Sequence, residues 1–136
     1  MALRGFARDL WARAEEALAA ARHLVPVSPD AAASRSCYAA FYAVSALFAP
    51  EGSQFRKHSA VQAAVHRDLV RPGRWPPALG EDYDLLFGPR ETGDYGGGEH
   101  VSPAEVQAAI ESAERILEAA RGCRPELGGG GGSGST

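Results

Sequence analysis

Apolar residues recur at the spacing of a helix along most of the chain. Residues 2–24 keep one apolar stripe opposite a face of Arg and Glu side chains, which predicts a long amphipathic helix. Ser28 followed by Pro29 has the form of an N-cap with proline at the first helical position, so a second helix is expected from there to about Ala49. That helix is apolar over most of its circumference, which indicates a central place in a bundle or at a subunit interface.

Two shorter helices are expected in the middle of the chain. The third should span 57–70, with Val, Ala and Leu side chains turned inward, and it ends at an Arg-Pro-Gly sequence. A fourth, less regular helix is predicted from Trp75 through Phe87. Gly88–Pro89 then begins a predicted flexible loop that is rich in glycine.

The last predicted helix carries clear boundary signals. Ser102 and Glu105 have the spacing of a capping box, and the helical period continues to Arg121. Residues 125–136 are rich in Gly and Ser and are expected to be a flexible tail, either a linker or an addition, behind a helical domain at 1–124. No segment alternates with a period of two. The sequence therefore predicts an all-α fold, an antiparallel bundle of four or five helices.

Composition excludes several classes of protein. The chain has 136 residues, a single-domain length, and a net charge of −3, which argues against a broad basic surface for duplex DNA. Cys37 and Cys123 form neither a disulfide framework nor a metal-ligand cluster, so a reducing cytoplasm is expected, without metal or cofactor. No apolar run is long enough for a membrane span, and no signal peptide is visible.

Three local clusters hold the side chains best suited to chemistry. They are Ser34-Arg35-Ser36-Cys37-Tyr38-Ala39-Ala40-Phe41-Tyr42-Ala43, Lys57-His58-Ser59-Ala60-Val61 and Arg90-Glu91-Thr92-Gly93-Asp94-Tyr95. Each also has a plain structural reading. The aromatic residues can be core or interface side chains, His58 a solvated or capping residue, and Arg90 with Asp94 a surface ion pair. Cys37 fits a small buried apolar position.

Taken together, the clusters resemble the HEPN family (higher eukaryotes and prokaryotes nucleotide-binding), in particular its small single-domain prokaryotic branch. Those proteins carry Ser-Arg-x-x-Tyr-Ala-x-Phe on the second helix, Lys-x-His-Ser at the start of the third and Arg-x-x-x-Asp-Tyr before the last. The residues that match are Ser34, Arg35, Tyr38, Ala39 and Phe41, then Lys57, His58 and Ser59 without the intervening residue, then Arg90, Asp94 and Tyr95. The resemblance covers about residues 1–121.

The resemblance implies a helical bundle that forms a symmetric homodimer and acts on or binds RNA or nucleotides. Many family members are metal-independent ribonucleases, and many small ones are toxins encoded beside a minimal nucleotidyltransferase antitoxin. His is suited to moving the 2′-hydroxyl proton near neutral pH, and Arg to holding phosphate charge. On this basis the expected catalytic residues are Arg90, His58, Asp94 and Tyr95, and the expected RNA- or nucleotide-binding residues are Arg35, Tyr38, Lys57 and Ser59.

One departure keeps a second hypothesis open. The nuclease members carry Arg-x(4–6)-His, whereas the residues five to seven positions after Arg90 are Tyr95, Gly96 and Gly97. His100 lies ten positions after Arg90, so it would need the glycine-rich loop to fold back. The alternative is a catalytically silent HEPN module that binds nucleotides or docks a nucleotidyltransferase. A third reading is an unrelated helical oligomer with no nucleotide role.

Overall fold

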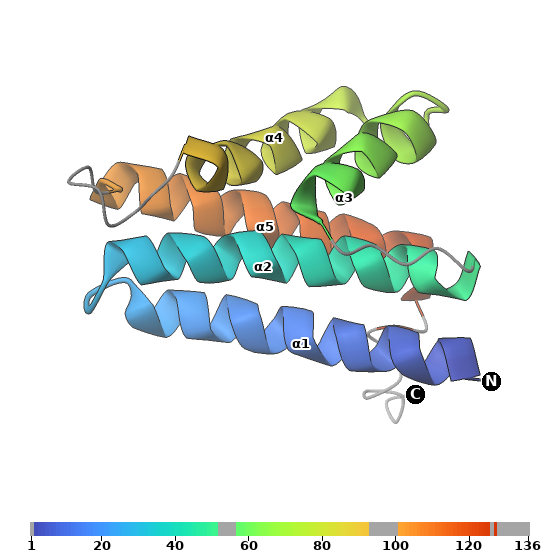
Figure 1. The fold of residues 1–136 in the computed structure, drawn as a ribbon, viewed down its shortest axis with the longest axis horizontal. Coiled ribbons are helices and arrows are strands. Elements are labelled where there is room, and N and C mark those ends of the chain that lie inside the picture. Colours follow the sequence, from blue (N-terminus) through green and yellow to red (C-terminus); the bar gives the residue numbers. More distant parts are fainter. Residues whose placement is uncertain (1, 52–56, 93–100, 126, 128–136) are drawn as a thin grey trace.

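The computed structural model describes residues 2–51, 57–92, 101–125 and 127, and the regular elements within these ranges are all helical. Three long helices lie side by side, and a pair of shorter helices lies across them (Figure 1). The long ones are α1 (Ala2–Leu24), α2 (Pro29–Phe48) and α5 (Pro103–Cys123), and the short ones are α3 (His58–Ala64) and α4 (Pro77–Thr92). The predicted all-α bundle of four or five helices is confirmed, with five helices in the described residues.

The predicted helix starts at Ser28 and Ser102 are confirmed in atomic detail. Ser28 Oγ accepts a hydrogen bond from the Ala31 amide at 3.2 Å. Ser102 Oγ accepts from the Glu105 amide at 3.1 Å, and Glu105 Oε1 accepts from the Ser102 amide at 2.8 Å, which completes the capping box. These bonds satisfy amides that no helical carbonyl can reach, so both helices begin where the sequence predicts.

Helix α2 is the central element of the bundle, as predicted. It packs against α1, α3, α4 and α5. Ala39, Ala40 and Ala43 of α2 are fully buried, and their short side chains allow neighbouring helices to approach closely. Larger side chains fill the rest of the core, among them Val44, Leu47, Phe48, Val61, Leu69, Tyr83, Ile110, Ile116 and Leu117. Leu127, beyond α5, is also buried against this core.

The third helix has the predicted extent but changes from α-helix to π-helix along its length. The α-helical turns of α3 continue into a π-helical segment, η2 (Val65–Val70), which α4 contacts. There the Arg71 amide donates to the His66 carbonyl, five residues back, at 2.9 Å. Single π-helical turns are rare and occur preferentially near functional sites.

The prediction that a loop begins at Gly88–Pro89 is wrong, because α4 continues to Thr92. Proline has no amide hydrogen, so Pro89 leaves the carbonyl of Leu85 without its helical donor. The Leu85 side chain is 45% exposed, which places this turn of the helix toward solvent, where water can bond that carbonyl. A proline therefore does not have to end a helix where water can bond the carbonyl that loses its donor.

A smaller correction concerns the apolar face of α1. Ala7, Trp11 and Ala14 of the helix predicted for residues 2–24 are buried, whereas Phe6, also apolar, is 41% exposed. The buried face of α1 therefore does not include every apolar residue near its start.

Candidate functional site

His58 lies at the first turn of α3 within a ring of aromatic side chains from two other helices. The imidazole centroid is 4.5 Å from the ring of Phe41 and 5.1 Å from that of Tyr38, both on α2. Phe87 on α4 lies 6.4 Å away. The Tyr38 ring meets the imidazole edge-on, with 73° between the planes, and the Phe41 ring is tilted by 37°. The half-buried imidazole is therefore held by three helices.

A buried thiol contacts one nitrogen of this imidazole. Cys37, 2% exposed as predicted for a small core residue, places Sγ 3.5 Å from Nδ1 of His58. Tyr83 of α4 is also buried, and its hydroxyl has no hydrogen-bond partner among the described residues. Burial first, and the nearby Cys37 second, raise the pKa of Tyr83 above its usual value. Tyr83 therefore stays protonated at neutral pH, which excludes it as a general base.

A cation and two aromatic rings extend the site along α2. The guanidinium carbon of Arg35 lies 4.9 Å from the centroid of the Tyr38 ring, within range of a cation–π interaction. The Tyr38 and Tyr42 rings are 6.0 Å apart. All three side chains are half-buried. The structure thus brings Arg35, Tyr38 and His58 together, and their assignment to a functional site stays a prediction.

Lys57 and Ser59 flank His58 on the exposed side of the same turn. Both are exposed, and Lys57 occupies the N-cap position of α3 without a side-chain capping bond. Lys57 thus places a positively charged, exposed side chain next to His58 in the sequence. The aromatic rings around His58 are more buried than Lys57 and Ser59, so the exposed part of the site is polar and its more buried part is aromatic.

The third predicted cluster is described only in part. Arg90 lies on α4, three residues beyond Phe87, so its backbone is about one helical turn from the α4 aromatic residue whose ring lies 6.4 Å from that of His58. The Arg90 side chain, and all of Asp94 and Tyr95, lie outside the described residues. Their assignment to the site stays a prediction.

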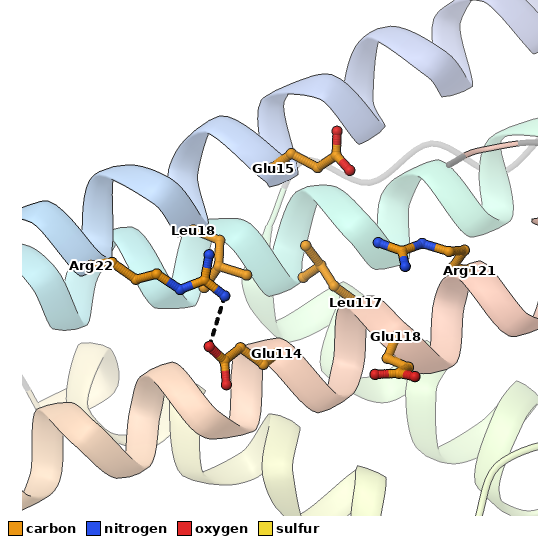
Figure 2. A pocket seen from close by; sticks show the side chains of 7 residues that line it. All are labelled: Glu15, Leu18, Arg22, Glu114, Leu117, Glu118 and Arg121. Atoms are coloured by element: carbon orange, nitrogen blue, oxygen red, sulfur yellow. Dashed lines mark hydrogen bonds and ion pairs between the residues drawn. The ribbon is translucent and has the colours of Figure 1, made fainter. Parts of the chain in front are cut away.

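A separate hollow lies between α1 and α5, away from these residues. Its volume is about 420 Å³, and its walls carry two arginines, three glutamates and two leucines (Figure 2). An ion pair of 2.7 Å between Arg22 and Glu114 joins the two helices beside it. None of the predicted site residues lines the hollow. Its mixed charges favour no particular ligand.

A polar seam that the sequence analysis missed joins α3 and η2 to α4. Asp84 Oδ1 accepts a hydrogen bond from Gln62 Nε2 at 2.7 Å and lies 2.9 Å from His66 Nε2. Gly80 leaves room for this imidazole, because a Cβ there would lie 2.8 Å from Cε1 of His66. Gln62 and His66 are four residues apart, which places them on one face of a helix. That spacing was the only feature of the sequence that could have indicated this cluster. The seam holds α3 against α4 and so fixes His58 relative to Phe87.

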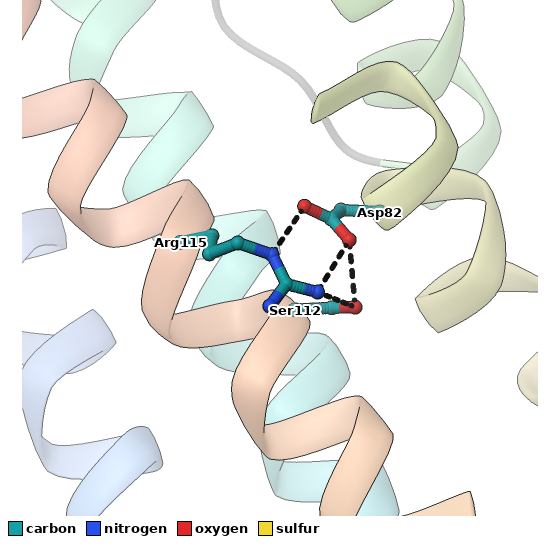
Figure 3. Close-up of polar contacts among 3 residues, drawn as sticks. All are labelled: Asp82, Ser112 and Arg115. Carbon is teal, nitrogen blue, oxygen red and sulfur yellow. Dashed lines mark hydrogen bonds and ion pairs between the residues drawn. The ribbon is translucent and has the colours of Figure 1, made fainter. Parts of the chain in front are cut away.

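A second polar cluster fastens α4 to α5 (Figure 3). Asp82 accepts two hydrogen bonds from Arg115, from Nε to Oδ2 at 2.9 Å and from Nη2 to Oδ1 at 2.8 Å. The buried hydroxyl of Ser112 donates to Asp82 Oδ1 at 3.0 Å. Hydrogen bonds from Arg115, supplemented by Ser112, lower the pKa of Asp82 against the opposing effect of burial. The carboxylate therefore stays charged and holds α4 in place.

The part of the chain that the structure describes holds neither a metal-binding cluster nor a membrane-spanning helix. No three His, Cys, Asp or Glu side chains in it gather closely enough to hold a metal ion. None of its helices is both long and apolar enough to cross a membrane.

Comparison with known proteins agrees with the motifs and the fold. The family model for the HEPN domain matches residues 7–123, which include all five helices except the first five residues of α1. A UPF0332 protein of Thermotoga maritima is 42% identical over 88 residues, which cover 65% of this chain and 67% of that protein. The matched family region contains Arg35, His58 and Arg90. The chain belongs to the HEPN domain family.

Proposed function

We propose that this protein is a metal-independent endoribonuclease and the toxin half of a two-gene module with a minimal nucleotidyltransferase. The observation that carries the proposal is the setting of His58. Its imidazole packs against aromatic rings of α2 and α4, one of which, Tyr38, also carries the guanidinium of Arg35, and α4 is the helix that carries Arg90. A proton-transferring group needs this kind of fixed orientation, because misplacement by about 1 Å can reduce a rate by roughly a hundredfold.

The proposed chemistry is transesterification at a phosphodiester. His58 takes the proton from the 2′-hydroxyl, and the 2′-oxygen attacks the phosphorus. The bond between phosphorus and the 5′-oxygen breaks, and a second acid protonates the leaving oxygen, with Tyr95 and His100 as the candidates. Arg90 holds the charge that develops on the phosphoryl oxygens. His suits the first role because its ordinary pKa of about 6.5 lies near neutrality.

The same residues suit the binding of single-stranded RNA or a nucleotide. Lys57 and Arg35 supply positive charge for phosphate contacts, and Tyr38 is already paired with a guanidinium at 4.9 Å. Aromatic and guanidinium planes are surfaces on which unpaired bases stack. The HEPN family context supports a homodimer in which the two Arg90 segments face a shared cleft, with the nucleotidyltransferase as a further partner.

A second candidate function follows from the sequence after Arg90. Because Tyr95, Gly96 and Gly97 occupy the positions where the nuclease motif has its His, the chain also fits a silent module. Such a module would keep the bundle and bind a nucleotide or dock the nucleotidyltransferase without cleaving RNA. The two functions differ in whether His58 is needed for a reaction or only for the aromatic packing.

The deciding experiment is digestion of total RNA by the purified protein in EDTA. Cleavage should persist without metal and fall by at least about a hundredfold in His58→Ala and in Arg90→Ala, the effect expected from loss of one catalytic group. His23→Ala is the control, since His23 is an exposed histidine on α1. Circular dichroism verifies that each variant is folded. Absence of cleavage, or cleavage that neither substitution reduces, would contradict the nuclease and leave the silent module.

A further inference from the structure

The segment from Lys57 to Gly80 is basic, although the protein as a whole is acidic. It carries four Lys or Arg side chains and one carboxylate, that of Asp68, which gives it a net charge of +3, whereas the whole chain has a net charge of −3. All the other residues of this segment are uncharged at pH 7, with histidine counted as neutral. Helix α3, η2 and the turn after them therefore carry a local excess of positive charge that can attract an anionic partner.

The end of this segment holds two arginines, Arg71 and Arg74, in a well-defined turn. The Gly73 amide donates to the carbonyl three residues earlier at 3.0 Å, and the Trp75 amide donates to the carbonyl six residues earlier at 2.9 Å. Gly73 has a φ of +89°, a conformation that glycine adopts readily, and Trp75 is only 2% exposed. The backbone of the turn is therefore fixed, whereas both arginines are exposed to solvent.

The positive charges of Arg71 and Arg74 are not neutralised within the described part of the chain. Arg67 donates to both carboxylate oxygens of Asp68, at 2.9 and 2.7 Å, and so occupies the acidic side chain of this segment. Neither Arg71 nor Arg74 forms an ion pair with any residue that the structure describes. A guanidinium has a planar set of N–H donors that matches the oxygens of a phosphate, so these two side chains are suited to bind phosphate groups.

The position of the turn on α3 favours RNA over an acidic protein as the partner. Arg71 follows His58 by 13 residues, and helical backbone connects them, so the two lie roughly 20 Å apart at about 1.5 Å per residue. The exposed residues between them include Ser59, Ala60 and Ala63, which have short side chains without charge. A single strand carries a phosphate at every nucleotide, so one strand can contact both ends of this helix at once.

We propose that Arg71 and Arg74 form a phosphate-binding site for single-stranded RNA, apart from His58, and that the strand lies along the exposed face of α3 between the two. This inference rests on the proposed function for what happens to the strand at His58, but binding of RNA at the turn does not require that the RNA be cleaved. The two arginines contribute to affinity and not to the chemical step.

A double substitution with a matched control tests this site. Arg71→Gln combined with Arg74→Gln removes both charges and keeps long polar side chains. The control is Arg8→Gln combined with Arg13→Gln, which removes the same charge from two exposed positions on α1. Figure 1 shows α2 between α1 and α3, so the control substitutions lie across the bundle from the proposed site. Circular dichroism verifies that both variants are folded.

The first readout is the binding of a labelled 2′-O-methyl oligouridylate, measured by fluorescence anisotropy in EDTA at several salt concentrations. The probe is about 12 nucleotides long, within the usual range of single-strand binding sites, and it lacks the 2′-hydroxyl that the proposed cleavage needs. The slope of log affinity against log salt concentration changes by about 0.7 for each phosphate contact on a single strand. We expect the double variant at Arg71 and Arg74 to have a slope that is less steep by about 1.4, and an affinity at about 0.1 M salt that is at least about tenfold lower.

The control should keep the wild-type slope. Equal slopes in the wild type and in the variant at Arg71 and Arg74, an equal loss of slope in the control, or a wild type that does not bind the probe would each overturn the proposal. Poly-glutamate is titrated in the same way. If only the binding of poly-glutamate depends on Arg71 and Arg74, the turn binds an acidic protein surface instead, and the proposal is overturned.

The second readout is RNA cleavage in EDTA, which separates binding from chemistry. With an unmodified oligouridylate, the variant at Arg71 and Arg74 should raise KM by at least about tenfold and leave kcat nearly unchanged, because the lost contacts hold substrate and transition state equally. With the dinucleotide UpU it should change neither, since the one phosphate of UpU is the cleaved one. A lower kcat on the longer RNA, or an equal effect on UpU, would overturn the placement of the site apart from His58. If the wild type cleaves no RNA, the proposed function fails, and the binding measurement alone decides the role of the turn.

Discussion

Removal of the Asp82 carboxylate should loosen α4 from α5. In the folded protein this carboxylate accepts hydrogen bonds from Arg115 and from the hydroxyl of Ser112, which is 1% exposed. The Asp82 side chain is itself only 12% exposed, whereas that of Arg115 is 56% exposed. The substitution Asp82→Ala therefore has two effects: it breaks an ion pair at the surface, and it leaves a buried hydroxyl without its acceptor.

The size of the loss follows from these two effects. A solvent-exposed ion pair contributes roughly 0.2–1 kcal/mol to stability, with the upper end appropriate to paired hydrogen bonds. A buried hydroxyl that loses its partner costs about 1–3 kcal/mol. We therefore expect Asp82→Ala to lower the free energy of unfolding by about 2 kcal/mol. Ser112→Ala in the Asp82→Ala background should recover about 1 kcal/mol, because the unsatisfied hydroxyl is then removed as well.

Urea unfolding monitored by circular dichroism measures this effect, and its pH dependence tests the cause. Hydrogen bonds from Arg115 lower the pKa of Asp82 below its usual value of 3.8. The carboxylate therefore stabilises the fold fully above about pH 4, and the stabilisation is lost as pH falls through the lower folded-state pKa. The stability difference between wild type and Asp82→Ala should be constant from pH 5 to 7 and shrink below pH 4.

The control for this prediction is Glu81→Ala, which removes the same charge from an exposed position one residue earlier on α4. It should change the free energy of unfolding by less than about 0.5 kcal/mol. An Asp82→Ala variant as stable as the Glu81→Ala control would refute the reasoning. So would a stability difference that grows as the solution is acidified.

Three further predictions concern the seam, the core and the assembly. Gly80→Ala should be destabilising despite a helix-propensity gain of about 1 kcal/mol, because the added Cβ would overlap His66. In a His66→Ala background the same substitution should be neutral or stabilising. If its effect on stability has the same sign in both backgrounds, that result would count against the seam. Leu69→Ala, at a fully buried position, should cost about 2–5 kcal/mol in urea unfolding, whereas Leu85→Ala, 45% exposed, should cost far less; equal losses would contradict the described core. Light scattering should report twice the chain mass of 14.3 kDa, and a monomer throughout the micromolar range would exclude the proposed homodimer.

Local signals in the sequence were sufficient for most of the fold. Capping residues such as Ser28 and Ser102 act within one turn, so their hydrogen bonds could be predicted without tertiary information. The position of α2 at the centre also followed from its own composition. Pro89 was misread because the effect of a proline depends on whether the affected carbonyl faces water, and that depends on how α4 packs.

The sequence named the candidate site residues but could not predict their contacts. Short motifs located Arg35, Tyr38 and His58, which the structure brings together. The contribution of Phe87 came from α4, whose orientation against α3 depends on Gly80 and the seam, and no local pattern encodes that pairing. Similarly, Cys37 could be read as a buried residue from helix periodicity, but its contact with Nδ1 of His58 depends on where α3 begins.

The chemical ends of the cleaved RNA test the central claim most directly. If His58 activates the 2′-hydroxyl, digestion in EDTA must produce 2′,3′-cyclic phosphate and 5′-hydroxyl ends, and a matched oligonucleotide with 2′-deoxyribose at the cleaved position must remain intact. Mass spectrometry of the products distinguishes these ends from others. Products with 3′-hydroxyl and 5′-phosphate ends, or cleavage of the deoxy-substituted oligonucleotide, would contradict the proposed role of His58.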